Sequence, residues 1–84
     1  MSESLTLYTR TGCPLCEEME DAVRRLLDGS SHTLTSVDVD ADPDLQGRFG
    51  WDVPLLFHGG NEICRHHFDP FAVQAWLRGH SQTA

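Results

Sequence analysis

Two cysteines separated by two residues are the part of this sequence best suited to chemistry: Cys13, Pro14, Leu15 and Cys16. They follow an apolar stretch and open an amphipathic run at residues 15–27. Thiols at this spacing, between an expected strand and an expected helix, are typical of a redox pair. A helix N-terminus carries partial positive charge and free N–H groups, which stabilise a thiolate on Cys13. Because the thiolate is the species that attacks a disulfide, this position predicts that Cys13 is a nucleophile.

The elements that must position this pair begin with a strand at residues 4–9, where apolar and polar residues alternate. Thr11 and Gly12 form a turn, Cys13 caps the helix, and Pro14 occupies the first helical position, where its missing N–H costs nothing. The following helix is predicted to bury one stripe of apolar side chains, namely Leu15, Met19, Val23, Leu26 and Leu27.

The second half of the chain predicts a strand at 34–39 and a polar turn that starts a short helix through residue 48. An apolar run at 53–58, followed by two glycines, predicts a hairpin whose second strand spans 62–66. A last helix starts after Asp69 and ends at Gly79. The predicted order is therefore strand, helix, strand, short helix, strand, strand, helix.

Length and composition narrow the class of protein. The chain has 84 residues, which predicts a single domain over residues 1–84, expected to be a monomer. A net charge of -7 without any lysine disfavours nucleic acid as a partner. No segment resembles a signal peptide or approaches the ~20 apolar residues of a membrane span, so a cytoplasmic protein away from membranes is expected. In that compartment, three cysteines favour catalytic, redox or metal roles over a structural disulfide framework.

The element order, the CxxC motif and Val53-Pro54 before the third strand together resemble the thioredoxin fold. A proline directly after the first cysteine is the pattern of the glutaredoxin branch of this fold. The chain is similar in particular to small bacterial glutaredoxin-like proteins. This resemblance implies an α/β domain with a four-stranded mixed sheet, βαβ then ββα, flanked by helices. It also implies that Cys13 is the nucleophile, that Cys16 is the resolving cysteine, and that Pro54 is a cis proline beside them.

The same resemblance implies a set of substrate-binding residues: Arg10, Pro14, Leu15, Asp52, Val53, Pro54 and Asp69. Arg10 stands where glutaredoxins often carry a lysine that contacts a glutathione carboxylate, and its charge would also favour the Cys13 thiolate. The backbone of Val53 could bind an extended substrate as an added strand. Asp69 is the nearest candidate to hold the amino-acid end of glutathione.

The sequence departs from the glutaredoxin pattern at two of these positions. Leu15 replaces an aromatic residue inside the motif, and Asp52 replaces the threonine that commonly precedes Val-Pro. Asp52 and Glu17 are acidic and would oppose a thiolate on Cys13, but we expect the helix N-terminus and Arg10 to outweigh them. Asp52 could also accept the proton of Cys16, which is expected to be buried and not ionised.

Two functions remain open from the sequence. The first is a thiol–disulfide oxidoreductase acting on a disulfide-containing protein or on glutathione, with glutathione as a co-substrate and no tightly bound cofactor. The second is a non-catalytic thioredoxin-fold binding module, or a carrier of a metal or an iron–sulfur cluster. If Cys13 and Cys16 bound a metal, the only plausible further ligands would be Cys64 and either His66 or His67. The two histidines are neighbours in a predicted strand and would face opposite sides of it, so both could not easily join one site.

The remaining aromatic and histidine residues carry no expected role in the chemistry. Trp51 and Trp76 are predicted to pack in the core or at its rim, and Cys64 is predicted to be a core residue of its strand. The other histidines are expected to be ordinary loop or terminal residues, namely His32, His58 and His80.

Overall fold

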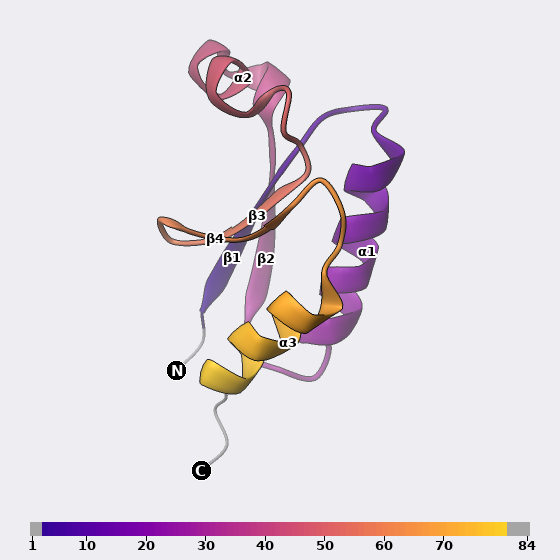
Figure 1. Cartoon of the computed structure of the whole chain (residues 1–84), viewed down its shortest axis with the longest axis vertical. Coiled ribbons are helices and arrows are strands. Elements are labelled where there is room, and N and C mark those ends of the chain that lie inside the picture. Colours follow the sequence, from indigo (N-terminus) through magenta and orange to yellow (C-terminus); the bar gives the residue numbers. More distant parts are fainter. Residues whose placement is uncertain (1–2, 81–84) are drawn as a thin grey trace.

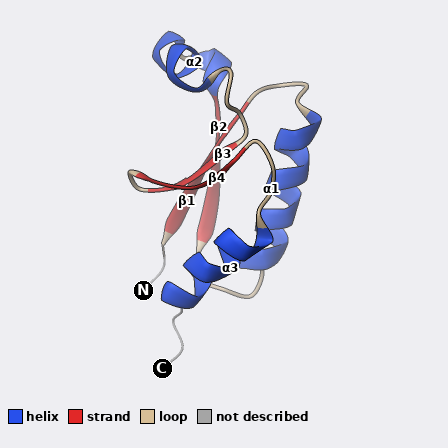
Figure 2. Ribbon diagram, viewed as in Figure 1, coloured by secondary structure: helices blue, strands red, loops and turns tan. Residues whose placement is uncertain are grey.

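The computed structural model describes residues 3–80 and contains the elements in the predicted order (Figures 1 and 2). These are β1 (Ser4–Thr9), α1 (Pro14–Leu27), β2 (Thr33–Asp38), a 3₁₀ turn η1 (Val39–Ala41), α2 (Pro43–Phe49), β3 (Leu55–His58), β4 (Asn61–Arg65) and α3 (Pro70–Gly79). The predicted bounds differ from these by one or two residues. Val39 belongs to the turn rather than to β2, and His66 lies just beyond β4.

The four strands form one mixed sheet in the order β2-β1-β3-β4. β1 and β2 are parallel and are joined through α1, whereas β3 pairs antiparallel with both β1 and β4. The chain therefore makes a βαβ unit followed by a ββα unit. This is the thioredoxin-like α/β fold that the sequence predicts.

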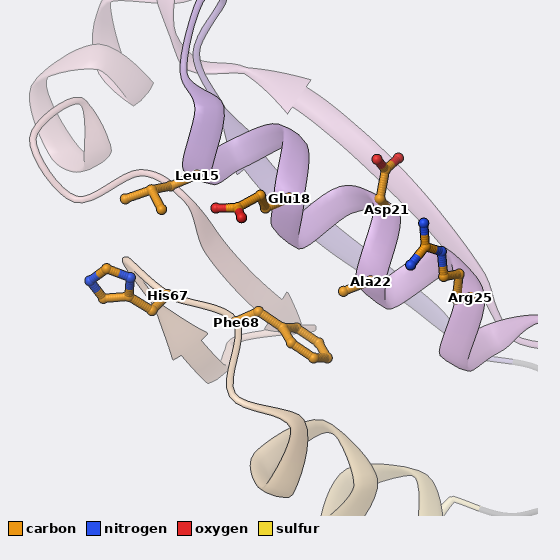
Figure 3. Close-up of a pocket in the computed structure, with 7 residues that line it drawn as sticks. All are labelled: Leu15, Glu18, Asp21, Ala22, Arg25, His67 and Phe68. Atoms are coloured by element: carbon orange, nitrogen blue, oxygen red, sulfur yellow. The ribbon is translucent and has the colours of Figure 1, made fainter.

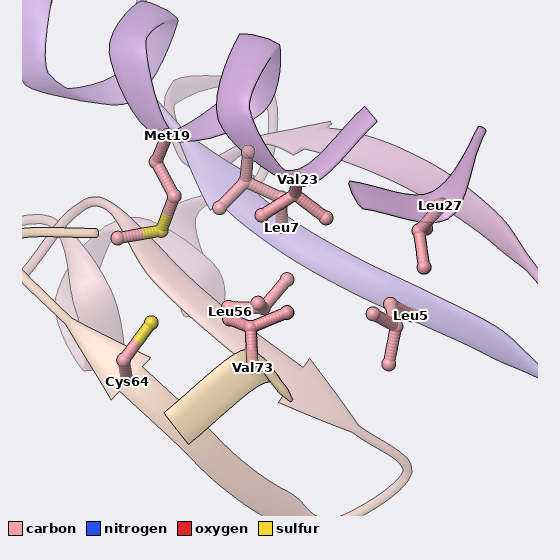
Figure 4. Packing of buried hydrophobic residues seen from close by; sticks show 8 residues of the cluster. All are labelled: Leu5, Leu7, Met19, Val23, Leu27, Leu56, Cys64 and Val73. Carbon is pink, nitrogen blue, oxygen red and sulfur yellow. The ribbon is translucent and has the colours of Figure 1, made fainter. Parts of the chain in front are cut away.

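One face of the sheet is covered by α1 and α3, which share a single core with β1, β3 and β4 (Figure 4). The cluster consists of Leu5, Leu7, Met19, Val23, Leu27, Leu56, Cys64 and Val73. Leu5 and Leu7 alternate with Thr6 and Tyr8 along β1, so both leucines point to the same face and are fully buried. Burying a leucine completely contributes on the order of 2 kcal/mol, so β1 is a main anchor of the core.

On the opposite face, α2 contacts one end of the sheet through aromatic side chains (Figure 1). Phe49, the last residue of α2, stacks on Tyr8 of β1 with 4.6 Å between ring centroids. Phe57 of β3 meets the edge of the same tyrosine at 5.6 Å. The buried cluster under α1 and α3 is mainly aliphatic, with Phe68 and Trp76 packed at its margin, whereas the contacts of α2 with the sheet are aromatic.

Two burial predictions are wrong. Leu15 does not belong to the buried stripe of α1, because it is 39% exposed whereas Cys16 is 2% exposed. At about 100° per residue, Cys16 lies closer than Leu15 to the direction of Val23, so the cysteine takes the inward position. Trp51 is 93% exposed and packs in neither core nor rim.

The register of the strands brings four loops to one end of the sheet. β1 ends at Thr9, beside the end of β2, and Tyr8 pairs with the first residue of β3, Leu55. Leu55 in turn pairs with Arg65, where β4 ends. The loop to α1, the start of η1, the loop before β3 and the end of β4 therefore lie at this end. Within the described residues, no helix is long and apolar enough to cross a bilayer.

Candidate active site

The cysteine pair lies where β1 passes into α1, at this end of the sheet. Cys13 is the N-cap residue of α1, and its Sγ accepts a hydrogen bond from the backbone N–H of Cys16 at 3.2 Å. Pro14 occupies the first turn, as predicted. Cys13 is partly exposed, Cys16 is buried, and all three cysteines are free thiols. The sulfur that a substrate can reach is therefore the one that receives the helix N–H group.

Cys16 is held in its protonated form. Burial raises the pKa of the Cys16 thiol from 9.0 to about 12, and its hydrogen bond with the sulfur of Cys13 adds to the effect. A backbone hydrogen bond from Arg10 and the charge of its side chain act in the opposite direction but are smaller. The motif thus contains one accessible sulfur and one buried thiol, as the sequence predicts for Cys16.

Arg10 lies near the cysteines but its guanidinium is engaged by η1. It donates two hydrogen bonds to the carboxylate of Asp40, at 2.9 and 3.0 Å. Gln46 donates a third hydrogen bond to the same carboxylate, so the Arg10 guanidinium and Gln46 together hold the pKa of Asp40 below its usual range. The forked donor that could bind a substrate carboxylate therefore already has a partner on this protein.

Asp52 contacts the residues at the end of β4. Its carboxylate lies 3.1 Å from His66 Nε2 and 3.6 Å from the guanidinium of Arg65. Arg65 also donates to Glu62, and this pairing lowers the pKa of the Glu62 carboxyl. The role of Asp52 as a proton acceptor for Cys16 stays a prediction, because its contacts run to β4 and not to the cysteine.

The loop before β3 is tied to the end of β4. The Val53–Pro54 peptide bond is cis, and the carbonyl oxygen of Pro54 accepts a hydrogen bond of 2.7 Å from the backbone N–H of His66. His66 has a positive φ of 69°, which non-glycine residues rarely adopt, and the chain turns there towards α3. Substrate binding by Val53 and Pro54 stays a prediction.

Asp69 performs a structural task in α3. As the N-cap, its carboxylate accepts hydrogen bonds from the N–H groups of Phe71 and Ala72, at 3.0 and 3.1 Å. The Gly59-Gly60 turn of the predicted hairpin connects β3 to β4 at the other end of the sheet from Cys13. Contact of Asp69 with glutathione remains untested.

A groove of about 450 Å³ extends along α1 from the cysteine motif. Figure 3 shows Leu15 and Glu18 of α1 on one side of it, and His67 and Phe68 from the connection between β4 and α3 on the other. Leu15 is one of three large hydrophobic side chains that are exposed among the described residues. The exposed leucine of the motif thus lines one end of this groove, beside the cysteine pair.

The sequence did not reveal the histidine cluster at the far end of the sheet. His32 is 6% exposed, and the rings of His58 and His80 both lie against Trp76 with centroids 5.1 and 4.3 Å away. His32 lies in a loop and His80 follows the last helix, as expected, but His58 belongs to β3, and all three rings make tertiary contacts that the sequence did not predict. They come from segments about 26 and 22 residues apart in the chain, so no local spacing could have connected them.

Comparison with known proteins agrees with this geometry. Residues 4–78 match the family model described as "Glutaredoxin-like domain (DUF836)". The structure is similar to protein Ne2328 from Nitrosomonas europaea, with 32% identity, a TM-score of 0.75, and coverage of 88% of this chain and 89% of that one. It is also similar to the target protein XcR50 from X. campestris, with 32% identity, a TM-score of 0.68, and coverage of 89% and 96%. A search among curated proteins finds no match.

The similarity extends to glutaredoxins at the level of the fold. The E. coli glutaredoxin structure shares 22% identity and a TM-score of 0.57, over 95% of this chain and 99% of that one. The fold and the cysteine motif at the start of α1 define a thioredoxin-fold protein of the glutaredoxin type. Within that class, the chain belongs to the glutaredoxin-like domain family (DUF836).

Proposed function

We propose that this protein is a thiol–disulfide oxidoreductase in which Cys13 is the nucleophile and Cys16 the resolving cysteine. The observation that carries this proposal is the pairing of one accessible sulfur, receiving a helix N–H at 3.2 Å, with one buried and protonated thiol three residues later. A hydrogen bond from a helix N-terminus favours a thiolate over a thiol, and the thiolate is the attacking species.

In the first step, the Cys13 thiolate attacks one sulfur of the substrate disulfide. The S–S bond breaks, its second sulfur leaves as a thiolate that takes up a proton, and Cys13 forms a mixed disulfide with the substrate. In the second step, Cys16 loses its proton and attacks the sulfur of Cys13. The S–S bond between Cys13 and the substrate breaks, and the second substrate sulfur leaves as a thiolate that takes up the proton released by Cys16. The substrate has then gained two electrons, and the cysteine pair is a disulfide. An external thiol reductant must then reduce the pair.

The order of these steps follows from the environment of Cys16. Its high pKa prevents it from competing with Cys13 for the substrate. The negative charge of Cys13 and its hydrogen bond to Cys16 both contribute to that high pKa, and a mixed disulfide removes the charge. Cys16 therefore becomes easier to ionise after the first step, when its attack is needed.

For the substrate, we favour the disulfide of a protein over glutathione. The two side chains suggested for glutathione, Arg10 and Asp69, are bound to Asp40 and to the N-terminus of α3. The exposed side chain of Leu15 and the adjoining groove would instead suit an extended peptide, held by added-strand contacts to Val53. Glutathione would then act mainly as the reductant. A cytoplasmic location fits cysteines that serve redox chemistry rather than a structural disulfide framework.

Trapping the mixed disulfide tests this proposal. The Cys16→Ser variant retains the nucleophile but cannot resolve a mixed disulfide. It is mixed with oxidised glutathione or with a peptide that contains one disulfide, and the mass of the protein is followed with time. Cys13→Ser is the matched control. Rapid adduct formation that requires Cys13 supports the oxidoreductase, and faster reaction with the peptide supports the protein substrate. If neither disulfide forms an adduct while the variant remains folded, the proposal is wrong.

A further inference from the structure

Three potential metal ligands converge at the end of the sheet opposite Cys13. Glu3 directly precedes β1, His58 ends β3, and His80 follows α3. One ligand atom from each side chain lies within 4.8 Å of the other two. His58 Nε2 and Glu3 Oε1 are 3.3 Å apart. Two atoms bound at about 2.0–2.1 Å to one tetrahedral ion are separated by about 3.3 Å, so this pair is already at the spacing of shared ligands.

Among residues 3–80, one ring nitrogen of His80 makes a hydrogen bond and the other has no partner. Nδ1 lies 2.9 Å from the carbonyl oxygen of Trp76. A carbonyl oxygen can only accept, so Nδ1 must carry the proton and Nε2 keeps its lone pair. A histidine that donates one ring N–H to a backbone carbonyl is the usual state of a metal ligand, because that bond fixes both the tautomer and the ring orientation.

His32 fixes the backbone of two of the ligand residues without being a ligand itself. Its Nδ1 accepts a hydrogen bond from the backbone N–H of Glu3 at 3.1 Å, which leaves the proton on Nε2. Nε2 then donates to the carbonyl oxygen of His80 at 3.0 Å. One buried ring therefore holds the segment before β1 against the segment after α3. Glu3 and His80 are thus positioned before any ion arrives.

The surroundings of the three ligands are partly apolar. The indole of Trp76 stacks on the ring of His80, with 4.3 Å between centroids and 14° between planes, and meets the ring of His58 at 5.1 Å. The indole N–H is buried and has no hydrogen-bond partner among the described residues. An indole N–H can only donate a hydrogen bond, so Trp76 contributes apolar surface to the site and is not a ligand. Partial exclusion of water also strengthens the attraction between a carboxylate and a cation.

We propose that Glu3, His58 and His80 form a binding site for a divalent transition-metal ion of the zinc type. Two imidazoles and one carboxylate are a ligand set that Zn²⁺ uses, with the fourth position left for water. The three ligands come from the start of β1, the end of β3 and the end of α3, so a bound ion links these three segments. It does not involve the cysteine pair and is independent of the redox function proposed above.

Metal titration of a cysteine-free motif tests the site. The background is an untagged Cys13→Ser, Cys16→Ser double variant, so that neither the motif nor a histidine tag binds the ion. Zn²⁺ is titrated by calorimetry and Co²⁺ by visible absorbance at about pH 7.5, because a histidine binds a metal ion through its neutral imidazole. Three further variants each remove one ligand, namely Glu3→Gln, His58→Gln and His80→Gln. His67→Gln is the matched control, because His67 is exposed and lies outside the cluster.

We expect one ion per chain, a Co²⁺ spectrum without sulfur charge-transfer bands, and a higher melting temperature with Zn²⁺. Each ligand variant should weaken binding by at least about tenfold, and His67→Gln should not. Glu3→Gln keeps both backbone hydrogen bonds of Glu3, so it separates ligand loss from misfolding. Absence of saturable binding, or equal affinity in the ligand variants and the control, would overturn the proposal. In that case Glu3 and His58 form only an ion pair.

Discussion

Cys16 should react with iodoacetamide far more slowly in the folded protein than in the unfolded chain. The perturbation is a Cys13→Ser substitution, which leaves Cys16 as the remaining thiol of the motif. Burial is the largest cause of its high pKa and persists in this variant, whereas the contribution of the Cys13 sulfur is lost. The full shift, from 9.0 to about 12, therefore gives an upper limit for the effect.

The magnitude follows from the thiolate fraction. At pH 8, a thiol of pKa 9.0 is about one tenth ionised, and one of pKa about 12 is ionised to roughly one part in ten thousand. The nucleophilicity of a thiolate rises with its pKa, which recovers a factor of about 20–30. The net decrease is about thirtyfold with the full shift. Steric protection of a side chain that is 2% exposed slows the reaction further. We expect at least about a tenfold decrease in the variant.

The assay is alkylation at several pH values, in buffer and in urea, with digestion and mass spectrometry to quantify Cys16. In urea, the rate should level off above about pH 9, where the thiol is ionised. In the folded protein, it should continue to rise by about tenfold per pH unit, since the pKa has moved upward. If the folded protein also levels off near pH 9, or reacts as fast as the unfolded chain, Cys16 is not held protonated by burial and the order of steps proposed above fails.

Two predictions concern stability, measured by urea unfolding followed by circular dichroism. Leu7→Ala should lower the free energy of unfolding by about 2–5 kcal/mol, because Leu7 is fully buried in the central core. Trp51→Ala is the control, because this side chain is 93% exposed. It should change the free energy of unfolding by less than about 0.5 kcal/mol. Similar losses of stability in both variants would contradict the described core. Asp69→Ala should cost about 1 kcal/mol by removing two hydrogen bonds at the start of α3, and Asp69→Ser should recover most of it. An unchanged midpoint in Asp69→Ala would show that the cap contributes nothing.

The order of the elements could be predicted because each has a strong local signal. Alternation marks β1, whereas α1 and α3 each begin with a cap residue followed by proline at the first helical position. The exposure of Leu15 could not be predicted as easily. Leu15 and Cys16 are neighbours with similar tolerance for burial, and the direction of α1 over the sheet decides which of them points inward.

The positions of the two cysteines in the candidate site could be predicted from the sequence, but the partners of its charged side chains could not. The cap position of Cys13 follows from the motif itself. The partners of Arg10 and Asp52 do not, because Asp40 and His66 come from segments 30 and 14 residues away. Such pairs depend on how the loops at the end of the sheet are placed, and a single sequence contains no record of that placement. The same holds for His32, whose two partners lie near opposite ends of the described chain.

The central strand β1 connects the two proposed sites. Glu3 precedes it, and Arg10 and the cysteine motif follow it. A six-residue strand at about 3.3 Å per residue separates its ends by roughly 17–20 Å, a distance at which substitutions normally act independently. Loss of a side chain at one site should therefore leave the other unchanged, whereas loss of Leu5 or Leu7 should affect both, since these two buried residues fix the strand between them. Both sites thus share one support, because the two fully buried leucines anchor β1 in the core that it shares with α1 and α3.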